Sequence, residues 1–314
     1  MTKPEINLEQ VLIVTGATGV GKTELILKLA QQIPSEIINA DIGQMYQPLT
    51  VGTAKPDWKN ELTPHHGFDI IIKPENFTVV QYRAFVLQKI VEIQARGKMA
   101  MIVGGSTFYI KALLFPPQEH IVVKQDCELE LEEVQDHDLW DQLNLIDPVR
   151  AQKIDLHDVY RLRQALNIWH KTGEIPSRFV PKYDPIAPYQ LVILDRPKVD
   201  LYARCNGRVH DMMQSGWIKE VNDLTPEWKN FLQIKKIIGY EVILDYLAGR
   251  IDLPACISLI QKRVRNYAKR QQTFWRGLKI AIANQNQAAR VLELDLTLCA
   301  LDLYINQLRN KLNK

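Results

Sequence analysis

The chain has 314 residues, 46% hydrophobic and 24% charged, which is enough for one large or two small globular domains with a substantial core. Its formal net charge is only +3, so overall charge does not argue for nucleic-acid binding. The four cysteines lack metal-ligand or disulfide spacing, no signal-peptide core opens the sequence, and no apolar run approaches about 18 residues. We therefore expect a cytoplasmic protein without a membrane span.

The first predicted elements are a strand, a loop and a helix. Residues 11–14 form an apolar run typical of a buried strand, and residues 24–32 are expected to form a helix. Between them, residues 16–23 match the P-loop pattern G-x-x-x-x-G-K-[ST]. In this order the backbone N–H groups of the loop point into one cavity, where they bind a polyphosphate. Lys22 would add a positive charge there, and the Thr23 hydroxyl would hold Mg²⁺.

Further strands and helices alternate along the first third of the chain. Residues 36–41 are expected to form a strand that ends in Asp41, residues 81–95 a helix, and residues 99–103 a strand followed by two glycines and Ser106. This alternation predicts an α/β fold with a P-loop NTPase-like parallel sheet flanked by helices. Ligands bind at the carboxyl ends of such strands, so we expect Asp41 and Ser106 on the same rim as the loop.

Each of these two side chains has a second interpretation. Asp41 either holds Mg²⁺ or accepts a proton, as a carboxylate near a P-loop does in a kinase, or it caps the following loop. Ser106 either presents its hydroxyl to a ligand or caps the next helix, and both roles can hold at once. No apolar strand closing on paired acids follows the P-loop at NTPase spacing, which argues against an ATPase motor.

The composition changes after Pro116 and Pro117. Residues 126–141 hold eight acids and no Lys or Arg, and the segment up to Pro188 has helical patterning with proline-rich joins. We predict a helical insertion subdomain at 118–188 within a core formed by 1–117 and 189–314. Residues 189–194 would return to the sheet, helices would follow through Lys279, and residues 291–296 would form a last strand before a short helix.

A basic and aromatic segment lies near the C-terminal end. Residues 261–279 hold seven Lys and Arg and no acid, with Tyr267, Phe274 and Trp275 interleaved. Basic side chains neutralise phosphates and aromatic rings stack on unpaired bases, so the segment favours RNA binding. The alternative is a solvated helix face whose aromatic rings point to the core. His65 and His66 lack carboxylate or Cys partners at ligand spacing, which favours structural hydrogen bonds over a metal site.

Together these motifs resemble the tRNA dimethylallyltransferases, also called tRNA isopentenyltransferases. The resemblance follows the chain in order over nearly its whole length. It includes residues 16–23, Asp41 with Gln44 and Tyr46, residues 52–56, Pro64 to His66, Val103 to Tyr109, Arg161-Leu162 before Ala165-Leu166, Arg204 with Arg208, Ile238 to Tyr240, and Tyr267 to Arg276.

The resemblance implies a reaction and its participants. Members of this family move a dimethylallyl group from dimethylallyl diphosphate to the exocyclic amine of the adenosine just 3′ of a tRNA anticodon. The diphosphate would then be bound by Gly16, Ala17, Thr18, Gly19, Val20, Gly21, Lys22 and Thr23, with Mg²⁺ on Thr23. Catalysis would involve Lys22, Asp41 as general base, Ser106 on the bridging oxygen and Arg204 on phosphate, with Arg208 a weaker candidate.

The resemblance also implies an anticodon stem-loop of tRNA as partner, and we expect a monomer. Residues matching tRNA-contacting stretches are Asp41, Ile42, Gly43, Gln44, Ser106, Arg161, Lys236, Gly239, Lys269, Arg270, Gln271, Trp275 and Arg276.

The chain departs from the family pattern at several positions, and other functions compete. Ile42 replaces a usual Ser, Gln47 a common Arg, Ser106 a Thr and Lys236 an Arg, while the acidic run replaces a stretch that usually carries Arg. One alternative is an adenylate isopentenyltransferase acting on free adenine nucleotides, but such enzymes lack the basic-aromatic segment. Others are a P-loop small-molecule kinase that uses ATP and a non-catalytic RNA-binding relative.

Overall fold

The chain divides into two compact units in the computed structural model, which describes residues 9–117, 138–178, 181–296 and 301–312. One unit comprises residues 1–114 and 185–314, and the other comprises residues 115–184. The acidic run predicted to belong to the insertion lies outside the described residues up to position 137.

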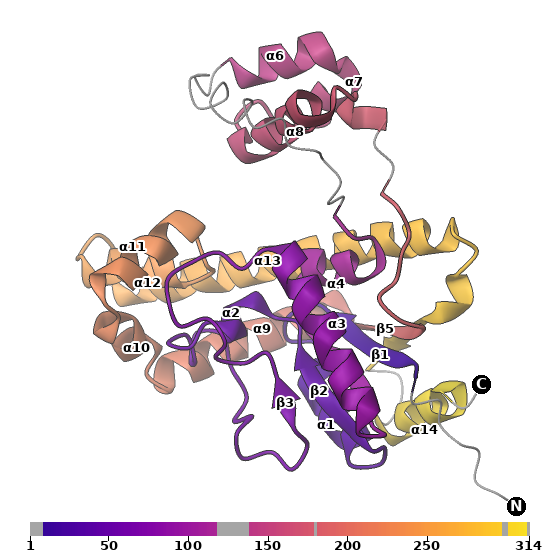
Figure 1. Ribbon diagram of the computed structural model, residues 1–314. Helices are drawn as coiled ribbons and strands as arrows, with labels where there is room; N and C mark the ends of the chain where they lie inside the picture. Colours follow the sequence, from indigo (N-terminus) through magenta and orange to yellow (C-terminus); the bar gives the residue numbers. More distant parts are fainter. Residues whose placement is uncertain (1–8, 118–137, 179–180, 297–300, 313–314) are drawn as a thin grey trace, which may run out of the picture. The chain divides into compact units, whose positions relative to one another are not determined.

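A six-stranded parallel sheet forms the centre of the larger unit (Figure 1). Its spatial order is β3-β2-β4-β1-β5-β6. The strands are β1 (Val11–Gly16), β2 (Ser35–Asn39), β3 (His65–His66), β4 (Met99–Val103), β5 (Tyr189–Asp195) and β6 (Val291–Asp295). The predicted fold class is therefore confirmed, although the short edge strand β3 was not expected.

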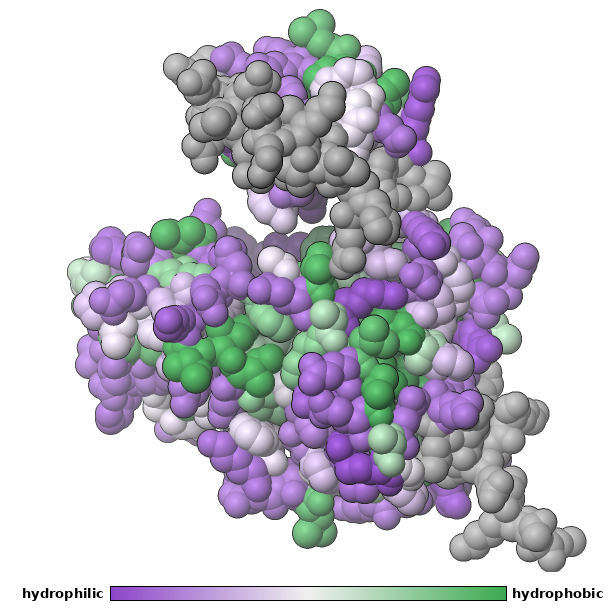
Figure 2. Space-filling view, in the orientation of Figure 1, coloured by the Kyte–Doolittle hydropathy of each residue, from purple (hydrophilic) through white to green (hydrophobic). Residues whose placement is uncertain are grey.

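Helices flank this sheet because each is apolar along the face that meets it. They are α1 (Lys22–Ala30), α3 (Val79–Ala95), α4 (Thr107–Leu114) and α14 (Leu301–Leu312). Helix α3 begins two residues before its predicted start, because Thr78 and Gln81 form a capping box there. Hydrophobic residues also gather on the outer surface over α3 (Figure 2), where Val80, Leu87 and Val91 are exposed.

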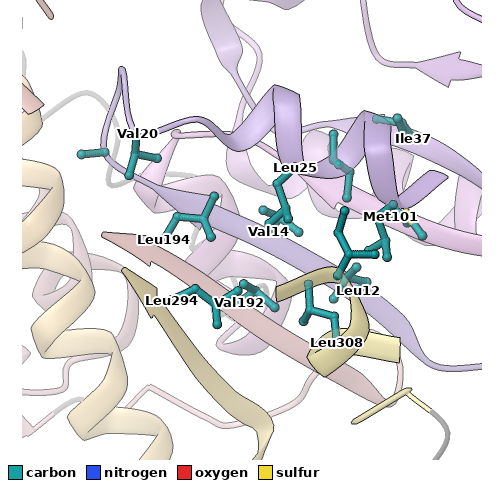
Figure 3. Packing of buried hydrophobic residues seen from close by; sticks show 14 of the residues in the cluster. Leu12, Val14, Val20, Leu25, Ile37, Met101, Val192, Leu194, Leu294 and Leu308 are labelled. Atoms are coloured by element: carbon teal, nitrogen blue, oxygen red, sulfur yellow. The ribbon is translucent and has the colours of Figure 1, made fainter. Parts of the chain in front are cut away.

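The main hydrophobic core of the larger unit packs against the P-loop and holds it in place. Alternate residues of β1, Leu12 and Val14, point to the face of the sheet that also receives Leu25 of α1 and Leu308 of α14 (Figure 3). Val20, within the loop itself, belongs to the same buried cluster. Apolar packing therefore fixes the loop on its core side. Its other side lines the cavity.

Six further helices follow the strands of the larger unit. Short α2 (Ile42–Met45) directly follows β2, and α9 (Lys198–Gln214), α10 (Trp217–Asp223), α11 (Pro226–Lys235) and α12 (Tyr240–Leu247) lead to long α13 (Leu253–Ala283). Asp252 caps α13, whose residues pack mainly against α9 and α12 (Figure 1). A short 3₁₀ turn, Ala288–Arg290, precedes β6.

The smaller unit is helical, with α6 (Leu139–Ile146), α7 (Pro148–Ala151), α8 (Val159–Thr172) and a 3₁₀ turn at Pro176–Arg178. These helices enclose an apolar core of their own that includes Leu143 and Leu162. Buried Asp147 joins two of the pieces, because its carboxylate accepts hydrogen bonds from the backbone N–H groups of Arg150 and Ser177.

The two adjacent histidines have structural partners. His66 Nε2 lies 2.7 Å from the carboxylate of Glu36, which also receives hydrogen bonds from Arg96 and Lys98, and His65 Nδ1 lies 2.7 Å from the carbonyl of Thr63. Although burial alone would raise it, these hydrogen bonds lower the pKa of Glu36 to about 2. Within the described parts of the chain, no helix is both long and apolar enough to cross a membrane.

Candidate active site

The candidate site is a cavity of about 780 Å³ at the carboxyl ends of the central strands. The P-loop, the segment after β2, α9 and α13 all contribute to its wall. This is the edge at which parallel α/β sheets bind ligands. The cavity is large enough for a diphosphate together with a base-sized group.

The P-loop supplies the cationic end of the cavity. Lys22 is the first residue of α1, and its Nζ donates hydrogen bonds to the carbonyls of Gly16 (3.1 Å) and Ala17 (2.9 Å). Burial and the nearby positive charge of Arg208 lower the pKa of Lys22 to about 8, although Asp41 opposes this shift. Thr23 follows on the same turn, is exposed and lines the cavity, as the predicted Mg²⁺ ligand must.

Asp41 also lines the cavity, and its predicted role as a cap is confirmed, whereas its role toward a metal or a proton stays a prediction. One carboxylate oxygen, Oδ1, caps α2 by accepting a hydrogen bond of 3.0 Å from Gly43 N–H. Burial raises the pKa of Asp41, while the positive charges of Lys22 and Arg208 act in the opposite direction. A carboxylate whose pKa is raised by burial is a stronger base than one in water.

Ser106 is held behind the cavity wall rather than on it. Its hydroxyl accepts a hydrogen bond of 3.0 Å from Ile42 N–H, and the residue is only 9% exposed. Gly104 makes this approach possible, because a Cβ there would lie 2.1 Å from the carbonyl oxygen of Ala40. Ser106 therefore positions the Asp41 segment, and its predicted contact with the diphosphate stays a prediction.

Two arginines of α9 approach the loop. Arg204 Nε donates to the carbonyl of Gly19 at 2.8 Å and remains exposed, whereas Arg208 donates to the Thr18 hydroxyl at 3.2 Å. Burial lowers the pKa of Arg208, and Asp41 partly offsets this effect. Arg208 is therefore at least as well integrated into the site as Arg204, which the sequence had favoured.

Gln271 connects α13 to the loop. Its side chain is 1% exposed and accepts a hydrogen bond of 2.9 Å from Thr18 N–H while donating one of 2.7 Å to the carbonyl of Gly105. Tyr267, one turn earlier, lines the cavity beside it. Gln271 was predicted to contact tRNA, and in the structure its amide is engaged with the phosphate-binding segment.

A second cluster, absent from the sequence-based prediction, holds the loop that contacts Gln44 of α2. The carboxylate of Glu220 accepts hydrogen bonds from three successive backbone N–H groups, those of Thr50, Val51 and Gly52, and from the Tyr240 hydroxyl. The loop held in this way also contacts α2, because the side-chain amide of Gln44 donates hydrogen bonds to the carbonyls of residues 53 and 54.

Trp217 fills the space between two loops in this cluster. It is 1% exposed, and a Cβ at Gly52 or at Gly239 would lie about 2 Å from its ring atoms. Gly239 also has a φ of +92°, a conformation that favours glycine. Gly239, predicted to contact tRNA, is thus buried against an indole ring.

The remaining residues predicted to bind tRNA fall into four groups. Ile42, Gly43, Gln44 and Lys236 line the cavity. Lys269, Arg270 and Arg276 are exposed on α13, and Arg161 belongs to α8 of the smaller unit, where it pairs with Asp158. Trp275 is only 2% exposed and packs into the core, so its ring is not presented to a base.

The fold and the cavity define a P-loop protein in which Asp41 lines the same cavity as the loop. A sequence model described as IPP transferase matches residues 44–278. Because this match covers well over half of the chain, the chain belongs to the IPP transferase family.

Individual proteins support the same assignment. A tRNA dimethylallyltransferase of Pseudothermotoga lettingae is 34% identical over 86% of this chain and 88% of its own length, and one of Fervidobacterium nodosum is 35% identical over 87% and 90%. The full-length tRNA isopentenylpyrophosphate transferase of Bacillus halodurans shares 28% identity, with a TM-score of 0.67 and coverage of 97% for both chains. A eukaryotic dimethylallyltransferase acting on tRNA is also 28% identical, with a TM-score of 0.75 over 91% of this chain and 73% of that one.

The Glu220 cluster can be tested by a single-atom change. In Glu220→Gln one acceptor oxygen becomes an NH₂ group that faces backbone donors, so we expect a loss of about 2 kcal/mol in unfolding free energy. Hydrogen exchange at the amides of residues 50–52 should accelerate at least about tenfold. Tyr240→Phe removes one hydrogen bond but keeps the carboxylate, and should have a smaller effect on both measurements. Unchanged exchange at these amides in Glu220→Gln would show that the carboxylate does not hold the loop.

Proposed function

We propose that this chain is a tRNA dimethylallyltransferase. It transfers a dimethylallyl group from dimethylallyl diphosphate to the exocyclic N6 amine of an adenosine in tRNA and releases diphosphate. One observation carries the proposal: the P-loop and Asp41 line the same cavity. We further propose that the target is the adenosine just 3′ of the anticodon, and that the enzyme acts as a monomer in the cytoplasm.

The reaction exchanges one bond for another at a single carbon. The N6 nitrogen of adenine attacks C1 of the dimethylallyl group, the C1–O bond breaks, and the electron pair leaves with the diphosphate. The amine loses one proton, for which Asp41 is the acceptor in this proposal. Burial strengthens this carboxylate as a base, which suits a weak nucleophile that becomes acidic only as the new bond forms.

The P-loop side of the cavity stabilises the leaving group. Negative charge develops on the diphosphate as the C1–O bond breaks, and the loop N–H groups, Lys22, Arg204 and Arg208 are the donors for it. Mg²⁺ fits here as well, because it binds through one or two protein oxygens together with phosphate, and the exposed Thr23 hydroxyl lines the cavity. When bound, the ion would neutralise diphosphate charge.

The outer face of α13 supports a polyanionic partner. Lys262, Lys269 and Arg276 follow one another at helical spacing and are all exposed. This stripe favours tRNA over the free adenine nucleotide of an adenylate isopentenyltransferase, which would need no such extended basic surface. A target base must leave its stack to reach Asp41, and the cavity volume permits this.

The function can be tested with purified protein, dimethylallyl diphosphate, Mg²⁺ and anticodon stem-loop RNA. We expect prenylated adenosine in the RNA and one diphosphate released per transfer. Prenylation of AMP in preference to RNA would support the adenylate alternative, and ATP hydrolysis or phosphoryl transfer without prenylation would support a kinase.

Two substitutions separate the two walls of the cavity. Lys22→Ala removes a charge from the leaving-group side and Asp41→Ala removes the proton acceptor, so each should lower kcat by at least about 10²-fold. Single-turnover rates at saturating RNA and donor measure the effect. Near-normal turnover in either variant would remove that residue from the mechanism.

The pH dependence follows from the lowered pKa of Lys22. With a pKa of about 8, Lys22 is charged below that pH and loses its proton above it. We therefore expect kcat/KM for dimethylallyl diphosphate to fall as pH rises through about 8, since this parameter reports the free enzyme. In Lys22→Arg the remaining activity should lack this limb, because a guanidinium stays protonated. Persistence of the same limb in that variant would assign it to another group.

The basic face of α13 predicts a change in salt dependence. Replacing Lys269 and Arg270 by Ala should weaken tRNA binding and reduce the slope of log K against log salt by about 1 to 2. Lys279→Ala is the matched control, because Lys279 is already paired with Glu293 at 2.6 Å. Titrations at several salt concentrations measure both. An unchanged slope in the double variant would assign these side chains to structure.

A further inference from the structure

An exposed aromatic ring stands beside the cavity and has no role in the mechanism. Phe108, the second residue of α4, is 65% exposed. Its ring meets that of Phe274 of α13 edge to face, with centroids 5.4 Å apart. Phe274 in turn meets Trp275 at 5.4 Å, and Trp275 is buried. Three rings thus run from the core to the surface and hold Phe108 in place.

The pair lies a short distance from the cavity along two different segments. Phe108 is three residues after Gly105, which lines the cavity, so its Cα lies within about 10 Å of that of Gly105. Phe274 is two helical turns after Tyr267, which also lines the cavity, or about 10 Å along the axis of α13. Both rings therefore belong to segments that reach the cavity wall.

The charges around the pair favour nucleic acid over an apolar partner. Lys269, Arg270 and Arg276 are exposed on the same helix as Phe274 and make no ion pair within the described residues. By contrast, Arg263 pairs with Glu241 and Lys279 with Glu293. Of these cations, Arg270 lies one turn before Phe274 and therefore on the same face of α13. An aromatic pair beside an uncompensated cation matches an unpaired base beside a phosphate.

We propose that Phe108, supported by Phe274, is a stacking platform for an unpaired RNA base that neighbours the adenosine held in the cavity. This inference rests on the proposed function, because it assigns the platform to the same bound RNA. Stacking uses the face of the base, so the platform would accept any base at that position and would orient the loop without reading its sequence.

The test compares Phe108→Ala with Phe108→Trp, using the anticodon stem-loop RNA in binding titrations and single-turnover prenylation. Phe108→Ala should weaken RNA binding at least about fivefold, whereas Phe108→Trp, which keeps a stacking face, should bind within about twofold of the unchanged protein. KM for dimethylallyl diphosphate should not change. Ile280→Ala is the control, since Ile280 is a 63% exposed apolar residue farther along α13.

A second arm identifies the stacked base. RNAs with a single abasic site on either side of the target adenosine are bound to the unchanged protein and to Phe108→Ala. One of the abasic RNAs should bind the unchanged protein at least about fivefold more weakly than the intact RNA does. Phe108→Ala should bind that abasic RNA and the intact RNA equally well.

Equal binding by Phe108→Ala and the unchanged protein, or an equal abasic effect in both, would overturn the stacking proposal while leaving the prenyl transfer intact. Absence of RNA prenylation by the unchanged protein would instead overturn the proposed function. The two failures are therefore distinguishable.

Discussion

The site depends on two hydrogen bonds made by the side-chain amide of Gln271, which fix the P-loop relative to α13. The amide joins the P-loop, the end of β4 and α13, although Thr18 and Gln271 are 253 residues apart in sequence. The amide donates in one direction and accepts in the other, and because Gln271 is buried, loss of either hydrogen bond would leave a buried polar group of its side chain unpaired. The helix with the basic outer face is therefore fixed directly to the loop that binds phosphate. Movement of α13 by a bound RNA would act on Thr18 without an intermediate element.

The opposed charges in the cavity stay close together because the Gln271 hydrogen bonds hold the P-loop, β4 and α13 in place. Lys22, Arg208 and Asp41 perturb one another, with burial the largest cause of each shift. Such a group is stable only where the charges stay close, because a buried charge without its partner is costly. The Glu220 cluster contributes from the other side, since it holds the loop that contacts Gln44 and thereby α2. Both supports act on the backbone of the site rather than on its reactive atoms.

Local sequence patterns predicted the loop, the central strands and the edge of the sheet that carries the site. They succeeded there because an apolar run, a glycine-rich turn and a helix are specified by neighbouring residues. Glu220 and Trp217 could not be predicted in this way, because their partners at residues 50–52 and 239 are adjacent only in the folded chain. The aromatic residues of α13 show the same limit. Composition suggested that Trp275 faces RNA, but the helix turns that ring inward and leaves Phe274 nearer the surface.

The departures from the family pattern at residues 42 and 106 have a common physical basis. Ile42 interacts with Ser106 through its backbone N–H, which every residue except proline supplies. Ser106 needs only a hydroxyl oxygen to accept that hydrogen bond, and serine and threonine provide the same acceptor. The contact that positions Asp41 is therefore independent of the side chain at 42 and insensitive to the exchange at 106. What Ile42 does change is the cavity wall, where an apolar residue follows Asp41, whose pKa burial raises.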